Sequence, residues 1–118
     1  MSDLFSGILV KDFVAASRWY EQLLGGPPDF FPHDTEAVWQ LAEHQYIYIV
    51  QMPERAGHAI VMQMVDDLNA QISGISTRGL KYSQREYFAN DVCKVTYNDP
   101  DGNQISFGGV ESVSPTDT

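Results

Sequence analysis

Four side chains in this sequence are best suited to metal binding or nucleophilic chemistry: His33, His44, His58 and Cys93. The histidines are dispersed along the chain and stand beside predicted turns. No motif pairs the thiol with a histidine or another base, which a catalytic cysteine needs in order to form its thiolate. We therefore expect Cys93 to be a buried, inert thiol, and the sequence identifies no catalytic residue.

The charge balance narrows the class of ligand. The chain of 118 residues, a length typical of one domain, has 7 Lys and Arg against 16 Asp and Glu, a net charge of −9. Phosphate contacts need clustered basic side chains, so this composition argues against nucleic-acid binding. An acidic surface instead attracts cationic small molecules.

The cellular location is expected to be cytoplasmic. One cysteine excludes an intramolecular disulfide framework and fits a reducing compartment. No apolar run approaches the ~20 residues of a membrane span, and the first residues lack the pattern of a signal peptide. We expect no membrane partner.

The pattern of apolar and turn residues predicts a strand over residues 4–10 and a helix from the capping Asp12 to Gly25. Strands are predicted over residues 29–34, 37–42 and 45–52, with a tight hairpin at residues 43–44. A second series then follows: a strand over 58–65, a helix that begins at Asp66 or Asp67 and ends at Gly79, and strands over 82–88, 92–98 and 104–108. Residues 111–118 lack an apolar face and are expected to form a flexible tail.

The order β-α-β-β-β therefore occurs twice. The segment LVKDF at residues 9–13 matches MVDDL at residues 64–68, an offset of 55 residues. Such self-similarity is typical of an internal duplication. Neither half is large enough to bury its sheet alone, so the halves must share a core within one chain or by exchange across a dimer.

Three segments carry a resemblance to a known family. They are WYEQLLG at residues 19–25, VDDL at residues 65–68 and DPDGNQISF at residues 99–107. In this order and spacing the sequence resembles the vicinal oxygen chelate superfamily, which includes glyoxalase I, extradiol dioxygenases and bleomycin-resistance proteins. The resemblance covers residues 4–109.

The resemblance implies an α+β fold of two tandem βαβββ modules, here over residues 4–57 and 58–109, in one domain of residues 1–110. Their curved sheets form a cup near a homodimer interface. In the metal-dependent members, four inward-facing His, Gln or Glu side chains in this cup bind one divalent ion. Fold alone does not decide which member's activity is present.

Carried over residue by residue, three of the metal-ligand positions fall on Phe5, Ile60 and Ser106, and the internal offset also pairs Phe5 with Ile60. The remaining position falls on Tyr48 or Val50. None of these side chains is an imidazole or a carboxylate, the donors that transition metals need. We therefore expect no metal cofactor and no metal-dependent chemistry in this cup.

A cup without metal would be an aromatic and aliphatic pocket suited to a flat organic ligand, with attraction for cations from its aromatic faces. The candidate ligand-binding residues are Phe5, Trp39, Tyr48, Ile60, Met62, Tyr87 and Ser106. The leading hypothesis is a homodimeric, bleomycin-resistance-like protein that binds a small aromatic or cationic molecule. One alternative is a lyase or dioxygenase that recruits a metal through His58 with Glu54 or Glu43; another is a partner-binding module without a ligand.

Overall fold

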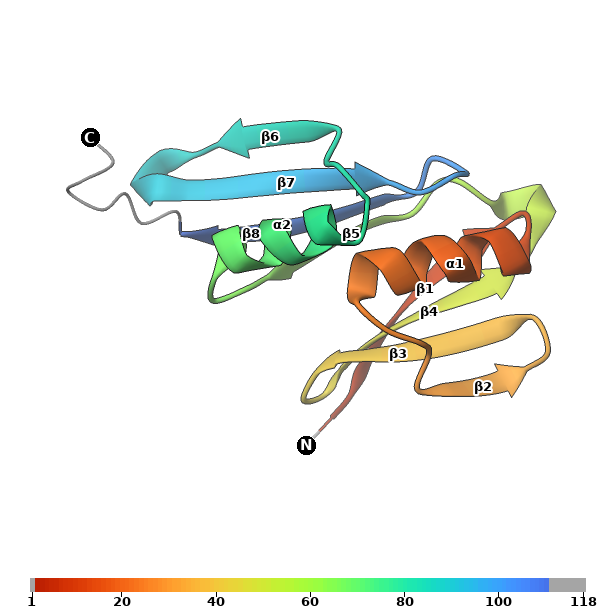
Figure 1. The fold of residues 1–118 in the computed structure, drawn as a ribbon. Coiled ribbons are helices and arrows are strands. Elements are labelled where there is room, and N and C mark those ends of the chain that lie inside the picture. Colours follow the sequence, from red (N-terminus) through yellow and green to blue (C-terminus); the bar gives the residue numbers. More distant parts are fainter. Residues whose placement is uncertain (1, 111–118) are drawn as a thin grey trace.

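The chain folds as two βαβββ modules that together form an α+β domain (Figure 1). The computed structural model describes residues 2–110, so the predicted tail at 111–118 lies outside the described residues. Module 1 consists of β1 (Leu4–Val10), α1 (Phe13–Leu24), β2 (Phe30–His33), β3 (Glu36–Ala42) and β4 (Gln45–Gln51). Module 2 consists of β5 (Ile60–Met64), α2 (Leu68–Thr77), β6 (Gln84–Tyr87), β7 (Val92–Asn98) and β8 (Gln104–Val110). Short 3-10 turns occur at Pro53–Arg55 and Ala89–Asp91.

Both helices begin at an aspartate that caps the first turn. The Asp12 carboxylate accepts a hydrogen bond from the backbone N–H of Ala15 at 3.2 Å. In α2 the cap is Asp67, which accepts from the N–H of Ala70 at 3.0 Å, so the second of the two predicted aspartates serves this role. Each carboxylate satisfies a donor that the helix itself leaves without a partner.

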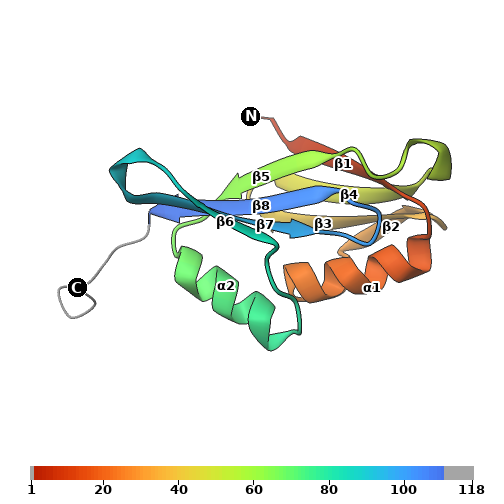
Figure 2. The same ribbon diagram turned by 90° about the horizontal axis from the view of Figure 1, so that it is seen from above.

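Each module has its own four-stranded sheet, in the order β1-β4-β3-β2 and β5-β8-β7-β6. The first strand of each module pairs in parallel with the last, and the remaining pairs are antiparallel. Figure 2 shows both helices on the same side of the strands, so within residues 2–110 the opposite side of the two sheets has no covering layer. We call that opposite side the bare face.

The strand boundaries differ from the predicted ones at the start of module 2. Residues 58–59 lie outside β5, because Gly57 turns the chain at φ 95° and the N–H of Ala59 donates to the Asn103 Oδ1 instead of entering the strand ladder. His58 is exposed in this connection. It therefore does not share the strand face of Ile60, as its position two residues upstream had suggested.

The two modules share one apolar core between sheets and helices. Side chains from both modules are fully buried in it, among them Ile8, Leu23, Ile75 and Phe107. Cys93 belongs to the same core, as predicted from its strand position. No helix within residues 2–110 is long and apolar enough to cross a membrane.

Candidate ligand-binding site

The bare face of module 1 is aromatic. Phe5 pairs across the strands with Tyr46, and Gly7 pairs with Tyr48, so these side chains stand on one face of the sheet. The Phe5 ring stacks on the Tyr46 ring with centroids 4.4 Å apart and planes inclined by 8°. The Tyr48 ring meets Phe5 edge-on, with centroids 6.5 Å apart. Tyr48 lies over Gly7, where a Cβ atom would be 2.6 Å from its ring, so any larger residue there would require the Tyr48 ring to move.

This face contains an open groove of about 580 Å³, a volume within the range of small-molecule sites. Its lining is largely apolar and comes from β1 to β4: Phe5, Leu9, Phe30, Pro32, Glu36, Val38, Tyr48, Val50 and Met52. Glu36 provides the one carboxylate of this lining, and its side chain is 20% exposed. The groove thus combines aromatic surfaces with a single negative charge.

The bare face of module 2 carries aliphatic and methionine side chains along β5. Ile60, Met62 and Met64 alternate along β5 on this face, and Ile60 is 78% exposed. Met62 stands opposite Ser106, whose hydroxyl lies 2.8 Å from that of Thr96 in a buried pair. The two methionines lie over Gly108, where a Cβ atom would collide with Met62.

The structure places two of the predicted ligand-binding residues away from the bare face. Trp39 points to the helix side, is 3% exposed, and donates its indole N–H to the carbonyl of Gly26 at 2.9 Å. Tyr87 pairs with the core residue Cys93 and therefore also belongs to the helix side of its sheet. The other five, Phe5, Tyr48, Ile60, Met62 and Ser106, belong to the bare face, with the first two in module 1 and the last three in module 2.

Of the nine lining residues of the groove, the predicted ligand-binding set contains only Phe5 and Tyr48, and it omits Phe30, Glu36 and Val38 among the others. Ala37, Val38 and Trp39 are consecutive and all buried, so hydrophobicity in this strand does not reveal which residues face the groove. The predicted hairpin at residues 43–44 would pair Trp39 with Tyr48, but the register shifts between Gln40 and Ala42, so Val38 opposes Tyr48 instead. Tyr48 and Val38 must share a face, which excludes Trp39 from it.

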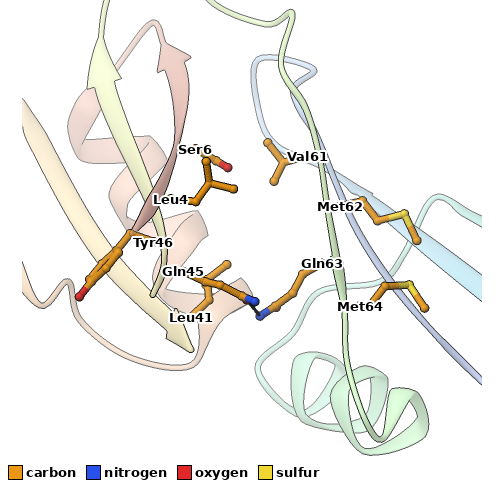
Figure 3. Close-up of a pocket in the computed structure, with 9 residues that line it drawn as sticks. All are labelled: Leu4, Ser6, Leu41, Gln45, Tyr46, Val61, Met62, Gln63 and Met64. Carbon is orange, nitrogen blue, oxygen red and sulfur yellow. Dashed lines mark hydrogen bonds between the residues drawn. The ribbon is translucent and has the colours of Figure 1, made fainter. Parts of the chain in front are cut away.

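A narrower cleft of about 220 Å³ separates the two modules (Figure 3). It is lined from one side by residues of module 1 such as Leu4 and Ser6, and from the other by Val61, Met62 and neighbouring residues of β5. The Gln63 amide donates to the Gln45 Oε1 at 3.2 Å across it. Within the described residues, β1 and β5 belong to separate sheets, so side chains rather than a strand ladder join their edges.

The register also shows which residue of module 1 is equivalent to Ser106. The pair Gly7–Tyr48 in module 1 corresponds to the pair Met62–Ser106 in module 2, so Tyr48 rather than Val50 is the counterpart of Ser106. The four positions hold a phenyl ring, a phenol, an aliphatic chain and a hydroxyl already hydrogen-bonded to Thr96. This donor set does not fit a divalent transition metal.

The histidines do not replace those donors. Among residues 2–110, no three His, Cys, Asp or Glu side chains lie close enough together to hold a metal ion. His44 contacts Asp3 and Glu43 at the exposed hairpin between β3 and β4, and His33 lies 4.0 Å from Glu36 at the end of the groove.

Known structures resemble this fold, and some similarity extends to the sequence. A glyoxalase/bleomycin resistance protein from Catenulispora acidiphila DSM 44928 is 53% identical over 94% of this chain and 100% of its own, with a TM-score of 0.90. The chain belongs to the glyoxalase/bleomycin resistance protein family. The predicted membership of the vicinal oxygen chelate superfamily is thereby confirmed.

More distant structures share the fold alone. A bleomycin-binding protein complexed with bleomycin is 16% identical over 94% of this chain and 100% of its own, with a TM-score of 0.75. A lactoylglutathione lyase from Agrobacterium tumefaciens is 16% identical, with 92% of each chain covered and a TM-score of 0.73. Neither a protein-family model nor a curated protein matches the chain.

Proposed function

We propose that this glyoxalase/bleomycin-resistance-family protein binds a small aromatic, cationic organic molecule in the module 1 groove without a metal ion. The observation that carries the proposal is the aromatic lining at the positions where metal-dependent relatives have ligands. Phe5 and Tyr48 present ring faces and edges to a space of about 580 Å³. Such surfaces suit a flat ligand and offer no route to metal-assisted catalysis.

The charge of the site and of the chain favours a cationic ligand. Glu36 borders the groove, and the chain has a net charge of −9. Cations over Tyr or Phe rings gain ~0.5–2 kcal/mol each, depending on how far water is excluded. The bleomycin-binding protein complexed with bleomycin shares this fold, which makes bleomycin a sensible first probe beside simpler aromatic cations.

We also propose that a second copy of the chain covers the bare face and completes the cup. Phe5 is 46% exposed, Met62 is 47% exposed and Ile60 is 78% exposed, on an uncovered sheet surface. Contiguous apolar surfaces of this kind mark interaction sites in soluble proteins. In a twofold dimer the module 1 groove of one copy would face the methionine surface of module 2 in the other, because such interfaces are self-complementary.

We also propose that the protein is cytoplasmic, because its single cysteine is buried and free, which fits a reducing compartment.

Metal content separates this proposal from the metal-dependent alternative. Protein purified without chelators should contain far less than one divalent ion per chain by inductively coupled plasma mass spectrometry. A stoichiometric ion that is lost with its activity on chelation would eliminate the proposal in favour of a lyase or dioxygenase. Metal-free protein that binds no member of a broad panel of aromatic cations would favour the partner-binding alternative.

A further inference from the structure

Module 2 contains a second cavity, on the helix side of its sheet and separate from the bare face. It has a volume of about 390 Å³. The α2 helix contributes Ile72 and Ser76, β7 contributes Tyr97, and the connection from α2 to β6 contributes Leu80, Lys81 and Tyr82. None of these residues belongs to the module 1 groove.

The internal duplication places a different aromatic residue at this position in each module. Val38 opposes Tyr48 as Thr96 opposes Ser106, so the next residues along these strands, Trp39 and Tyr97, occupy equivalent positions. The Trp39 indole reaches from the sheet to the carbonyl of Gly26 in the loop after α1. At the equivalent position in module 2, the smaller ring of Tyr97 lines the cavity.

Hydrogen bonds hold the loop over the cavity in place. The backbone N–H and the hydroxyl of Ser83 both donate to the carbonyl of Thr96, at 2.8 and 3.1 Å. The N–H of Leu80 donates to the carbonyl of Ile75, and the Arg78 guanidinium donates to carbonyls at the end of α1. The cavity is therefore formed in advance, which lowers the entropic cost of filling it.

The lining of this cavity contains one charged side chain, Lys81, and it belongs to a basic stretch of a protein that is otherwise strongly acidic. Residues 68–85 contain Arg78, Lys81 and Arg85 and no acidic residue, whereas the whole chain has a net charge of −9. The Arg85 guanidinium lies 5.9 Å from the centre of the Tyr82 ring. A local positive field of this kind concentrates anions at the site.

The polar groups at the wall are donors. Lys81 has an exposed ammonium group and Ser76 an exposed hydroxyl. Burial raises the pKa of the Tyr97 phenol, so its hydroxyl stays protonated. Ile72, Leu80 and the Tyr82 ring supply apolar surface beside these donors.

We propose that this cavity is a second binding site, which takes a small planar aromatic carboxylate. The ring lies among Ile72, Leu80 and Tyr82, and the carboxylate lies against Lys81. This ligand has the opposite charge to the one proposed for the groove and binds at a different site. Either proposal can therefore be wrong without affecting the other.

The test uses 2-naphthoate as the probe, with isothermal titration calorimetry and backbone amide NMR of the full chain. Titration should shift amide resonances within residues 72–82 and leave those of β1 and β4 unchanged. Lys81→Glu should weaken binding about tenfold or more, since it replaces a charge-assisted contact by repulsion. The matched charge reversal Lys11→Glu, on an exposed residue of module 1, should change the affinity less than twofold.

An unchanged affinity in Lys81→Glu would contradict the placement of the carboxylate, and a cavity-filling variant tests the position of the site itself. Ser76 is exposed at the wall, so Ser76→Phe should fill the space, abolish 2-naphthoate binding and leave the thermal unfolding midpoint near that of the parent. Binding that survives Ser76→Phe, or amide shifts confined to β1 and β4, would overturn the second site. Tyr48→Leu distinguishes the two proposals, because it should weaken binding of aromatic cations and leave 2-naphthoate binding unchanged.

Discussion

At the scale of single residues, a buried carboxylate joins the two modules. Asp99 is 4% exposed, and its side chain accepts four hydrogen bonds. Its Oδ1 accepts from the N–H groups of Asp101 and Asn103, both at 2.9 Å. Its Oδ2 accepts from the Asn103 amide and from the Tyr20 hydroxyl of α1, both at 2.8 Å. A buried carboxylate needs hydrogen-bond donors for both of its oxygens. Here one of the donors, the Tyr20 hydroxyl, comes from module 1, whereas Asp99 belongs to module 2.

Tyr20→Phe should lower the free energy of unfolding by about 1–3 kcal/mol, because it leaves one bond to a buried carboxylate oxygen unmade. Urea unfolding followed by circular dichroism measures the change. Tyr87→Phe is the matched control, since Tyr87 is 66% exposed and should tolerate loss of its hydroxyl. Equal stabilities of the two variants would contradict the importance of this contact.

The same contact predicts an alkaline loss of stability. Burial, with a further contribution from Asp99, raises the pKa of Tyr20 far above its ordinary value of 10.0. Above about pH 10 the unfolded chain therefore releases a proton that the folded chain keeps, and the free energy of unfolding falls as pH rises. Each such group contributes up to about 1.4 kcal/mol per pH unit, so Tyr20→Phe should give a shallower decline. If the free energy of unfolding fell equally steeply with pH in the parent and in Tyr20→Phe, the alkaline loss of stability would not come from Tyr20.

At the scale of elements, the duplication predicted most of the fold and only part of the site. The Asp12 cap, the Gly25 stop and the order of strands depend on local chemistry, so they are readable from sequence. The side of the sheet on which Trp39 lies is set by the register with β4. Burial does not reveal it, because Trp39 and the preceding strand residues are all buried. The cavity beside Tyr97 was not predictable, since its lining combines side chains of α2, β7 and the connection to β6 that only the fold brings together.

The connection between the modules contains a glycine with a specific backbone requirement. Gly57 has φ 95°, and a Cβ atom there would lie 2.5 Å from the carbonyl oxygen of Asp101. Gly57→Ala should destabilise the protein by about 1–3 kcal/mol, through strain in the left-handed region and displacement of this backbone contact. Gly26 serves as the control, because a Cβ atom added there would meet no other atom within 4 Å. Chemical denaturation should show that Gly26→Ala changes the free energy of unfolding by no more than about 0.5 kcal/mol. An equally small change for Gly57→Ala would contradict the proposed backbone requirement.

At the scale of the whole molecule, the helices cover one side of both sheets and leave the other side bare (Figure 2). The principal extents of the described chain are 50 × 33 × 24 Å, an elongated shape for its length. An elongated protomer with an exposed apolar sheet surface is suited to pairing with a second copy. The groove and the methionine surface would then be two halves of one ligand cavity.

Ile60→Asp should dissociate the proposed dimer, because it places a charge on an apolar surface that a second copy would bury. Light scattering coupled to size-exclusion chromatography should give a mass of two chains for the parent and a dissociation constant at least about tenfold higher for the variant. Val14→Asp is the control: Val14 is 60% exposed on α1, at the opposite side of the sheets. A monomeric parent, or equal dissociation by the two variants, would exclude this interface.

The most direct test of the central claim is a fluorescence titration of the protein with thioflavin T, a planar aromatic cation, in the presence of excess EDTA. The metal-free groove should bind the dye saturably, with the same affinity as untreated protein. Tyr48→Leu, which keeps an apolar side chain but removes the aromatic face, should weaken binding about 2- to 30-fold, the range of one cation–π contact. Binding that disappears in EDTA and returns with a divalent ion, or an affinity indifferent to Tyr48→Leu, would contradict the account.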